Sequence, residues 1–290
     1  MIAQLIGNTP LIRCQQLNTN PNVELWLKLE GQNPGGSIKD RAALNMVRTA
    51  LDSGAISLQT PLIEATSGNT GIALAMICAV YGLSIELVMP ENSTIERVKT
   101  MKAYGAKVTL TPASDGIEAS RDYAQKRVTT EGYFSFNQFD NEANSQAHYL
   151  GTGPEIWRDT HQQVTHFVAT MGTTGTISGT GRFLKEQNPS VKVIGVQPKE
   201  GAKIPGIRKW SAEYMPNIFE PSAVDKVSEV SLEEATTTME LLAKKEGVFA
   251  GISSGGSVKV ALDLCNQLDK GLIVAIICDR GDRYLSDMDF

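Results

Sequence analysis

Short apolar runs alternate along the chain with longer segments in which apolar residues recur every three or four positions. The short runs, rich in branched residues, predict strands, and the longer segments predict helices. Such alternation is typical of βαβ units, in which helices cover both faces of a mainly parallel sheet. We therefore expect an α/β fold. The predicted strands are residues 24–29, 85–89, 107–110, 166–169, 192–196 and 272–278.

Two of the predicted helices differ in how their apolar residues are distributed. Ser231 is followed by Glu234 in the pattern of a capping box, and apolar positions then recur on one face, at Ala235, Met239, Leu242 and Ala243. This predicts a structural helix. Residues 71–81 are instead apolar nearly all round, which predicts a buried helix. Because a helix N-terminus carries partial positive charge, the polar turn before this helix is a candidate site for an anion.

The composition excludes several classes of function. With 290 residues, 41% of them hydrophobic, the chain can bury one large core or two moderate ones. Its formal net charge of −5 has the wrong sign for a surface that binds nucleic acid. The apolar stretch 71–82 is shorter than the ~20 residues that span a bilayer, and no signal-peptide pattern follows Met1. We therefore expect a cytoplasmic protein that binds neither nucleic acid nor membranes.

Neither the cysteines nor the histidines have the spacing of a metal site or a redox motif. The cysteines form no Cys-x-x-Cys pair, and three of them lie in apolar runs, where a reduced thiol behaves as a small hydrophobic group. The histidines show no cysteine or carboxylate at ligand spacing. We expect free thiols, histidines that pack or face solvent, and no metal at Cys14, Cys78, Cys265, Cys278, His148, His161 and His166.

Lys39 lies between a glycine-containing turn, residues 33–38, and an apolar helical pattern at 42–47. It is therefore expected in the first turn of a helix, where the dipole disfavours a cation and a lowered lysine pKa is plausible. A neutral amine is what imine formation requires. Most lysines at helix starts are simply solvated, so this position alone is weak evidence for catalysis.

A second turn, residues 64–71, consists largely of small hydroxyl and amide residues and opens the buried helix. Its backbone N–H groups and hydroxyls converge at a helix N-terminus, which suits an anion such as a carboxylate. A plain strand-to-helix turn capped by serine and asparagine explains the pattern equally well. Both interpretations stay open at this point.

Two further turns open predicted helices. Residues 172–176 follow the strand at 166–169, and their amides and hydroxyls can surround a phosphate. They lack the lysine of a P-loop, and the glycine spacing of a dinucleotide-binding loop is absent. A single phosphate therefore fits better than a pyrophosphate. Residues 251–257, taken alone, are no more than a capped turn.

In combination, these turns resemble a known family. Four segments have the order and spacing found in the fold type II pyridoxal-phosphate enzymes, and specifically in the cysteine synthases. The resemblance covers nearly the whole chain. The segments are IGNTPL at residues 6–11, SIKDR at 37–41, TSGNTG at 66–71 and GTTGT at 172–176.

This resemblance implies a two-domain architecture. Each domain would contain a mainly parallel, twisted sheet covered by helices, and the active site would lie in the cleft between the domains. A smaller, mobile domain would comprise residues 40–140. A larger, cofactor-binding domain would comprise residues 1–39 and 141–290.

The resemblance also implies roles for individual residues. Lys39 would form the Schiff base with pyridoxal 5′-phosphate and then act as general base at Cα. Asn69 would hydrogen-bond the ring oxygen, and Ser253 would face the pyridine nitrogen, a neutral partner suited to β-elimination. The phosphate would be held by Gly172, Thr173, Thr174, Gly175 and Thr176. Substrate would be bound by Thr66, Ser67, Gly68, Asn69, Thr70, Gln138 and Arg208.

Three more segments are similar to the B-type cysteine synthases: residues 153–157, 204–210 and 278–284. Members of that type commonly carry two arginines where this chain has Arg208 and Lys209. Because arginine and lysine bind oxyanions differently, the preference for bulky anionic substrates stays open. We also expect no regulatory module, because the chain ends at Phe290.

The implied activity is that of a transferase in cysteine biosynthesis. An activated serine, O-acetylserine or O-phosphoserine, would lose its β-substituent to give an aminoacrylate. Sulfide or thiosulfate would then add to give L-cysteine or S-sulfocysteine. The alternatives are a related β-replacement or elimination on another serine derivative, and a non-catalytic homologue that binds a partner. The family resemblance favours a homodimer, and binding of a serine acetyltransferase tail is not expected.

Overall fold

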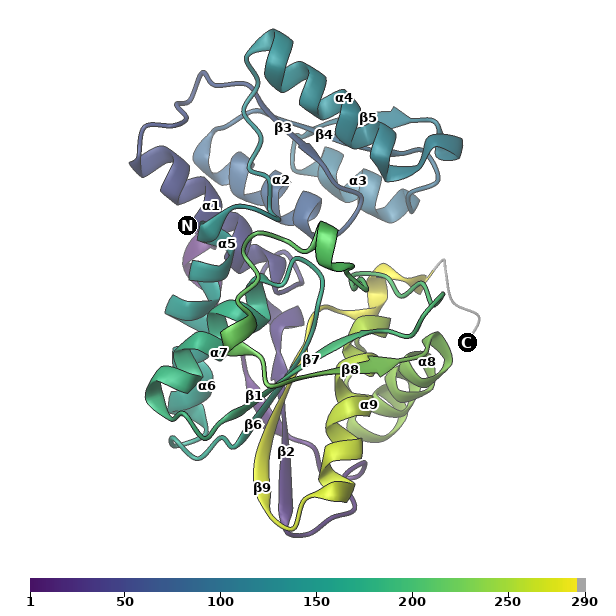
Figure 1. Ribbon diagram of the computed structural model, residues 1–290. Coiled ribbons are helices and arrows are strands. Elements are labelled where there is room, and N and C mark those ends of the chain that lie inside the picture. The colour runs from purple at the N-terminus through teal and green to yellow at the C-terminus, as the bar shows by residue number, and fades with distance from the viewer. Residues whose placement is uncertain (286–290) are drawn as a thin grey trace.

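Two sheets organise the chain in the computed structural model, which describes residues 1–285 (Figure 1). The smaller sheet has three parallel strands in the order β3 (Leu62–Ala65), β4 (Ile85–Pro90) and β5 (Lys107–Thr111). The larger sheet has six strands in the order β1-β2-β9-β6-β7-β8, and only β1 is antiparallel to its neighbour. These strands are β1 (Leu11–Arg13), β2 (Val23–Leu29), β6 (His166–Thr170), β7 (Lys192–Pro198), β8 (Lys226–Val230) and β9 (Gly271–Ile277).

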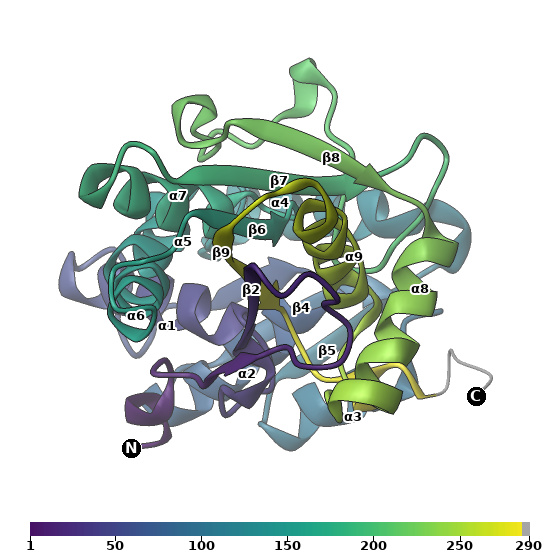
Figure 2. The same ribbon diagram turned by 90° about the horizontal axis from the view of Figure 1, so that it is seen from below.

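Helices cover both faces of each sheet, as expected for parallel strands. In the smaller sheet, Leu62 and Leu87 pack toward α1 and α2, whereas the next residues, Ile63 and Val88, pack toward α4. In the larger sheet, α8 and α9 lie on one face and α6 and α7 on the other (Figure 2). The helices are α1 (Lys39–Asp52), α2 (Asn69–Tyr81), α3 (Ile95–Ala103), α4 (Gly116–Glu131), α5 (Glu142–Ala147), α6 (Gly153–Asp159), α7 (Gly175–Gln187), α8 (Leu232–Leu241) and α9 (Ile252–Gln267).

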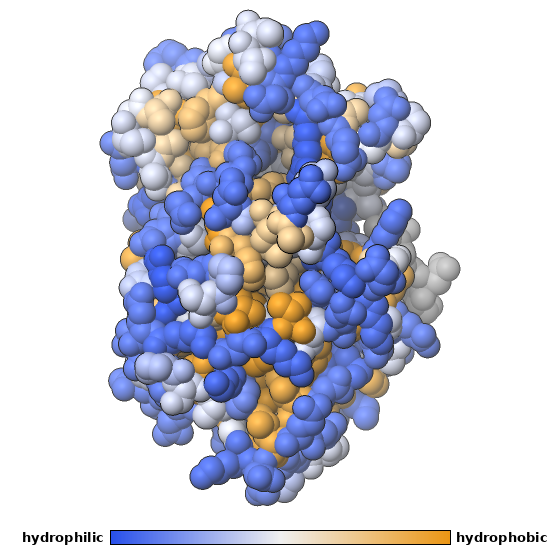
Figure 3. All heavy atoms as spheres, viewed as in Figure 1, coloured by the Kyte–Doolittle hydropathy of each residue, from blue (hydrophilic) through white to orange (hydrophobic). Residues whose placement is uncertain are grey.

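Hydrophilic side chains dominate the face seen in Figure 3, and apolar side chains show mainly in a central band. No helix among residues 1–285 is long and apolar enough to cross a bilayer. The two mainly parallel sheets covered by helices confirm the α/β class. The domain boundaries at residues 40 and 140 stay a prediction, and the chain end at Phe290 lies outside the described residues.

The six predicted strands are all present, with small shifts at their ends, and three others were missed. β1 has only three residues, and β8 is a mostly exposed edge strand, so both give a weak apolar signal. β3 is short and includes Glu64 and Ala65, which the sequence pattern assigned to a turn. The predicted strand at 272–278 ends one residue early, so that Cys278 lies beyond β9.

The two helix predictions are confirmed. α8 begins with the predicted capping box: Glu234 N donates to Ser231 Oγ at 3.1 Å, and Ser231 N donates to Glu234 Oε2 at 2.8 Å. In α2, residues 70–78 are all buried, and the helix ends at Gly82 in the left-handed conformation. The four cysteines are free thiols, also as predicted.

Candidate active site

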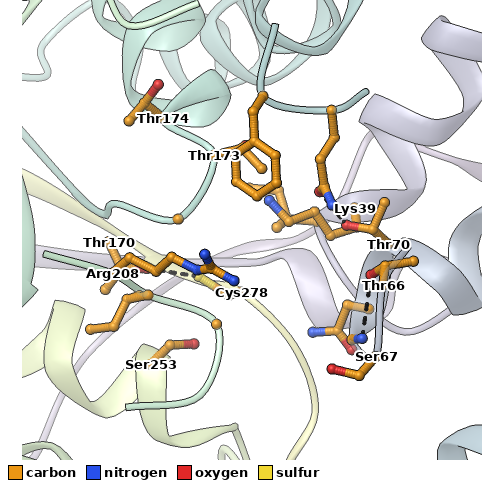
Figure 4. Close-up of a pocket in the computed structure, with 18 of the residues that line it drawn as sticks. Lys39, Thr66, Ser67, Thr70, Thr170, Thr173, Thr174, Arg208, Ser253 and Cys278 are labelled. Carbon is orange, nitrogen blue, oxygen red and sulfur yellow. Dashed lines mark hydrogen bonds between the residues drawn. The ribbon is translucent and has the colours of Figure 1, made fainter. Parts of the chain in front are cut away.

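A cavity of about 210 Å³ lies where the carboxyl ends of β3, β6 and β9 approach one another (Figure 4). Ligand sites in parallel α/β sheets characteristically lie at this end of the strands. Of the predicted site residues, only Gly175 does not line the cavity. Those that do are Lys39, Thr66, Ser67, Gly68, Asn69, Thr70, Gln138, Gly172, Thr173, Thr174, Thr176, Arg208 and Ser253.

Lys39 is the first residue of α1, as the sequence pattern predicts. Burial lowers the pKa of its amine, while the nearby Cys278 and Asp279 act in the opposite sense. Within residues 1–285 the amine has no hydrogen bond or ion pair to a side chain. Burial, more than the helix dipole, therefore explains why a neutral amine is accessible here.

The residues that follow Lys39 hold the start of α1 in place. Asp40 Oδ2 accepts a hydrogen bond from Gly35 N at 2.5 Å. Arg41 forms buried ion pairs with Glu30 and Glu155, both at 2.7 Å. Because both partners in each of these contacts are buried, the backbone at Lys39 has little freedom to move.

The loop at residues 172–176 passes close to another backbone segment. A Cβ on Gly172 would lie 2.6 Å from the carbonyl oxygen of Gly206, so only glycine fits. α7 begins at Gly175, and its first-turn N–H groups lack intrahelical acceptors. Within the described residues, the buried Thr174 Oγ1 also has no hydrogen-bond partner. Apart from Gly175 N, which donates to Thr173 Oγ1 at 3.4 Å, these donors are open to a phosphate.

His148 supports this loop and was missed as a site residue. Its Nε2 lies 3.2 Å from Thr176 Oγ1, and its Nδ1 lies 3.0 Å from Thr152 Oγ1. Burial, with repulsion from Arg41 and Lys39, lowers the pKa of His148 well below its usual value. The ring is therefore neutral and can orient the Thr176 hydroxyl. Nothing in the local sequence indicated this contact.

The turn at residues 66–70 connects β3 to α2, whose N-cap is Gly68. Thr70 Oγ1 donates to Gln138 Oε1 at 2.7 Å, which joins the turn to the loop at 135–138. The buried carboxylate of Glu64 holds that loop by accepting from Ser135 Oγ at 2.8 Å and from Phe136 N at 3.0 Å. The predicted anion-binding residues are thus brought together.

Asn69 makes contacts that the sequence did not indicate. Its Nδ2 donates to Asp279 Oδ2 at 2.6 Å, and its Oδ1 accepts from Arg283. Asp279 also accepts from the Tyr284 hydroxyl at 2.6 Å, and burial raises the pKa of its carboxyl. The Asn69 Nδ2 has a second hydrogen, so one donor stays available to a ligand in the cavity.

The opposite wall contains Ser253 and Cys278. Ser253 is the buried second residue of α9, which places its hydroxyl near the start of a helix (Figure 4). Cys278 Sγ lies 3.3 Å from Thr170 Oγ1, and burial raises the pKa of the thiol to about 11. Cys278 therefore lines the cavity as a neutral thiol.

Comparisons with known proteins give a consistent result. Residues 2–279 match the family model described as "Pyridoxal-phosphate dependent enzyme". Cysteine synthase B of Pseudomonas aeruginosa is 52% identical over 285 residues, covering 98% of this chain and 95% of that protein. Cysteine synthase B of Escherichia coli is 50% identical, covering 98% of this chain and 94% of that protein.

Solved structures agree. A cysteine synthase from Entamoeba histolytica is similar with a TM-score of 0.95 and 32% identity, covering all of this chain and 91% of the other. A hydrogen sulfide-producing enzyme from Fusobacterium nucleatum has a TM-score of 0.92 and 40% identity, covering 98% of this chain and 99% of the other. Fold and sequence comparisons thus point to one family.

Proposed function

The chain belongs to the pyridoxal-phosphate-dependent enzymes, and we propose that it acts as a cysteine synthase, replacing the β-substituent of an activated serine with sulfur. The observation that carries the proposal is the Lys39 amine, whose pKa is lowered by desolvation and which has no side-chain partner within residues 1–285. It lies in a cavity that also contains a phosphate-sized loop and an anion-binding turn. The high identity to cysteine synthases of the B type supports it.

The residues present fit pyridoxal 5′-phosphate. The loop at 172–176 would hold the phosphate with the first-turn amides of α7 and the unpartnered Thr174 hydroxyl. Lys39 would hold the aldehyde carbon, and Ser253 would offer a neutral hydroxyl to the ring nitrogen. When bound, the cofactor supplies an electron sink that stabilises negative charge at Cα of an amino acid.

The chain's own groups bind the substrate and move its proton. The Thr66 and Ser67 hydroxyls, with the N-terminus of α2, bind the α-carboxylate. Lys39, whose pKa is lowered by desolvation in the cavity, takes the proton from Cα and returns it after sulfur has added at Cβ. The walls of the cavity limit the access of water while the β-position is reactive.

The first test is removal of the amine. Lys39→Ala is expected to lower kcat by about 10³-fold or more, since general-base catalysis alone contributes 10²–10⁴-fold. It should also abolish the absorption band of the lysine-linked cofactor. Arg48→Ala, at an exposed position on the same helix, is the matched control and should retain both properties. Turnover of Lys39→Ala at the wild-type rate would refute the proposed function.

A second reaction deserves comparison because one structural neighbour is described as a hydrogen sulfide-producing enzyme. Elimination from cysteine would use the same lysine and the same carboxylate-binding turn. One comparison distinguishes the two activities. It sets the kcat/KM for sulfide release from L-cysteine against the kcat/KM for L-cysteine formation from O-acetylserine and sulfide. We propose that synthesis dominates, and a kcat/KM larger for sulfide release would reverse that assignment.

We further propose that the protein is cytoplasmic and forms a homodimer whose active sites are each built largely within one chain. Family resemblance supports the homodimer and the placement of its active sites. Light scattering of the purified protein would give the mass directly, and a monomer at working concentration would contradict the dimer.

A further inference from the structure

Asp279 lies where the segments that open three helices meet, although it does not itself line the cavity. The residue before it, Cys278, does line the cavity (Figure 4). The backbone of Asp279 pairs with Ser37, just before α1, and its carbonyl oxygen accepts from Gly251 N at 3.3 Å, just before α9. Its side chain contacts Asn69, the first residue of α2. Each of these helices contributes a predicted site residue in its first turn.

The side chain of Asn69 is held at both ends of its amide. Its Nδ2 donates to Asp279 Oδ2 at 2.6 Å, and its Oδ1 accepts from Arg283, which also donates to the carbonyl oxygen of Gly35. A guanidinium only donates and Asp279 Oδ2 accepts, so an amide turned end for end would lose both contacts. The amide therefore has one favourable orientation. Because Asn69 lines the cavity, the second hydrogen of its nitrogen is left for a ligand there.

This contact does not depend on the charge of the Asp279 carboxyl. Oδ2 accepts two hydrogen bonds, from Asn69 and from the Tyr284 hydroxyl, both at 2.6 Å. Oδ1 has no hydrogen-bond partner among the described residues, and it lies against Gly251, where a Cβ would overlap it. Burial raises the pKa of Asp279, and a proton that the carboxyl takes up would sit on Oδ1. Oδ2 thus accepts in either state.

Tyr284 supports the carboxyl from the side of the smaller sheet. Its side chain is buried, and its ring centre lies 5.2 Å from the guanidinium carbon of Arg97 on α3. Because α3 packs against α2, both groups that donate to Asp279 are supported by helices of the smaller sheet. Asp279 is therefore the point at which the chain beyond β9 meets them.

We propose that Asp279 is a positioning residue: it holds the Asn69 amide so that the nitrogen donates to the ring oxygen of pyridoxal 5′-phosphate. The inference rests on the proposed function and deepens it. A donor to that oxygen stabilises its negative charge, which favours the form of the lysine-linked cofactor with the shared proton on nitrogen. That form absorbs at the longer wavelength. The ratio of long- to short-wavelength absorption thus reports the Asn69 contact.

Spectra of the holoenzyme without substrate test the proposal. Asp279→Ala is expected to lower this ratio by about tenfold, the size of one hydrogen bond to a charged group. Tyr284→Phe removes only the hydroxyl that holds Oδ2 and should lower the ratio by about threefold, the size of one neutral hydrogen bond.

Two further variants serve as controls. Asp279→Asn keeps an oxygen that can accept from both donors, so it should retain the wild-type ratio. Asp282→Ala removes an exposed carboxylate of the same segment, which pairs with Arg280, and should leave the ratio unchanged.

A double variant shows whether the effect passes through Asn69. Adding Asp279→Ala to Asn69→Ala should change the ratio no further, because the group to be oriented is already absent. An equal fall in both backgrounds would overturn the inference. Titration of pyridoxal 5′-phosphate into cofactor-free protein separates a purely structural role: an Asp279→Ala protein with a raised Kd but the wild-type ratio would also overturn it.

The outcome stays decisive if Asp279→Ala fails to bind the cofactor. Tyr284→Phe then decides, and the wild-type ratio in that variant would contradict the positioning role. A wild type that shows the lysine-linked band but forms no cysteine from O-acetylserine and sulfide would refute the proposed function. An active wild type whose variants all keep its ratio refutes the positioning role alone.

Discussion

At the scale of single residues, the surroundings of Lys39 and Asp40 decide the protonation of their side chains. Lys39 was predicted from its position in a motif, but the lowered pKa of its amine comes from burial. The next residue, Asp40, is buried too, and its Oδ1 has no hydrogen-bond partner among the described residues. Burial is the main reason that the pKa of Asp40 rises from 3.8 to about 7. This carboxyl is therefore protonated in the folded protein under conditions where it is ionised in the unfolded chain.

This shift predicts a pH dependence of stability. A carboxyl whose folded pKa is raised contributes stability that is complete below about pH 4 and is lost as the pH rises through about 7. Asp40→Asn removes that dependence. The free energy of unfolding of the variant, minus that of the wild type, should therefore increase between about pH 5 and pH 8, by at most about 3 kcal/mol.

Urea unfolding at the two pH values measures this difference. Asp52→Asn, at the exposed end of the same helix, is the matched control. A difference between Asp40→Asn and wild type that is the same at both pH values would show that Asp40 is ionised in the folded state.

Local motifs predicted most of the site residues, because glycine, serine and threonine turns at helix starts are local patterns. The residues that were missed come from distant segments: Arg121 lines the cavity, and His148 and Asp279 contact residues that line it. Arg121 lies on an ordinary polar helix, and His148 contacts a loop 28 residues away. Asp279 contacts Asn69, 210 residues away. Their roles follow from tertiary packing, which a short sequence window does not contain.

At the scale of elements, α9 is held by a close approach that depends on one glycine. A Cβ on Gly255 would lie 2.0 Å from the carbonyl oxygen of Ala235 in α8. At Gly256 the nearest atom would be Val230 Cγ1, at 3.2 Å. Because Ser253 lies in the first turn of α9, the seating of this helix on α8 sets the position of that hydroxyl.

Gly255→Ala and Gly256→Ala should therefore differ, although they are adjacent in one helix. The first is expected to destabilise the protein by about 3 kcal/mol or more, since backbone blocks the added methyl group. The second should stay within about 1 kcal/mol of wild type, because the gain in helix propensity offsets a mild contact with a side chain. Free energies of unfolding measure both, and equal effects would contradict the packing described here.

The strands also differ in whether their own sequence predicts them or whether they depend on contacts with distant segments. Buried parallel strands such as β4 and β9 are continuous apolar runs and were predicted nearly to the residue. β8 was missed because the edge of a sheet does not require apolar side chains. The order of strands in either sheet was not predicted, since strand pairing depends on contacts between segments far apart in the chain.

At the scale of the whole molecule, a buried ionic cluster joins the smaller and larger parts of the fold. Lys28 on β2 pairs with Glu155 on α6 at 2.8 Å, and Arg41 on α1 pairs with both Glu155 and Glu30. All four side chains are at most 8% exposed. Removing Arg41 leaves Glu30 buried without its ion-pair partner.

Arg41→Met is accordingly expected to lower the free energy of unfolding by about 3–5 kcal/mol, because it leaves the Glu30 carboxylate uncompensated in the interior, whereas Glu155 keeps its ion pair with Lys28. Lys244→Met breaks an exposed pair with Glu240 of similar length, 2.8 Å, and should change stability by less than about 1 kcal/mol. Chemical denaturation of the two variants tests this contrast, and similar losses would mean that the buried cluster contributes no more than a surface pair.

The pairing of β2 with β9 has a consequence for how the protein is made. These neighbouring strands are aligned from Val23 opposite Gly271 to Leu29 opposite Ile277, so they come from opposite ends of the chain. During synthesis, which proceeds at about 5–20 residues per second, β2 leaves the ribosome early and has only β1 as a partner until the last segment appears. The smaller sheet, complete by Thr111, can form on the nascent chain. The direction of translation thus favours the smaller sheet forming first, because β2 lacks its partner β9 until residues 271–277 have been made.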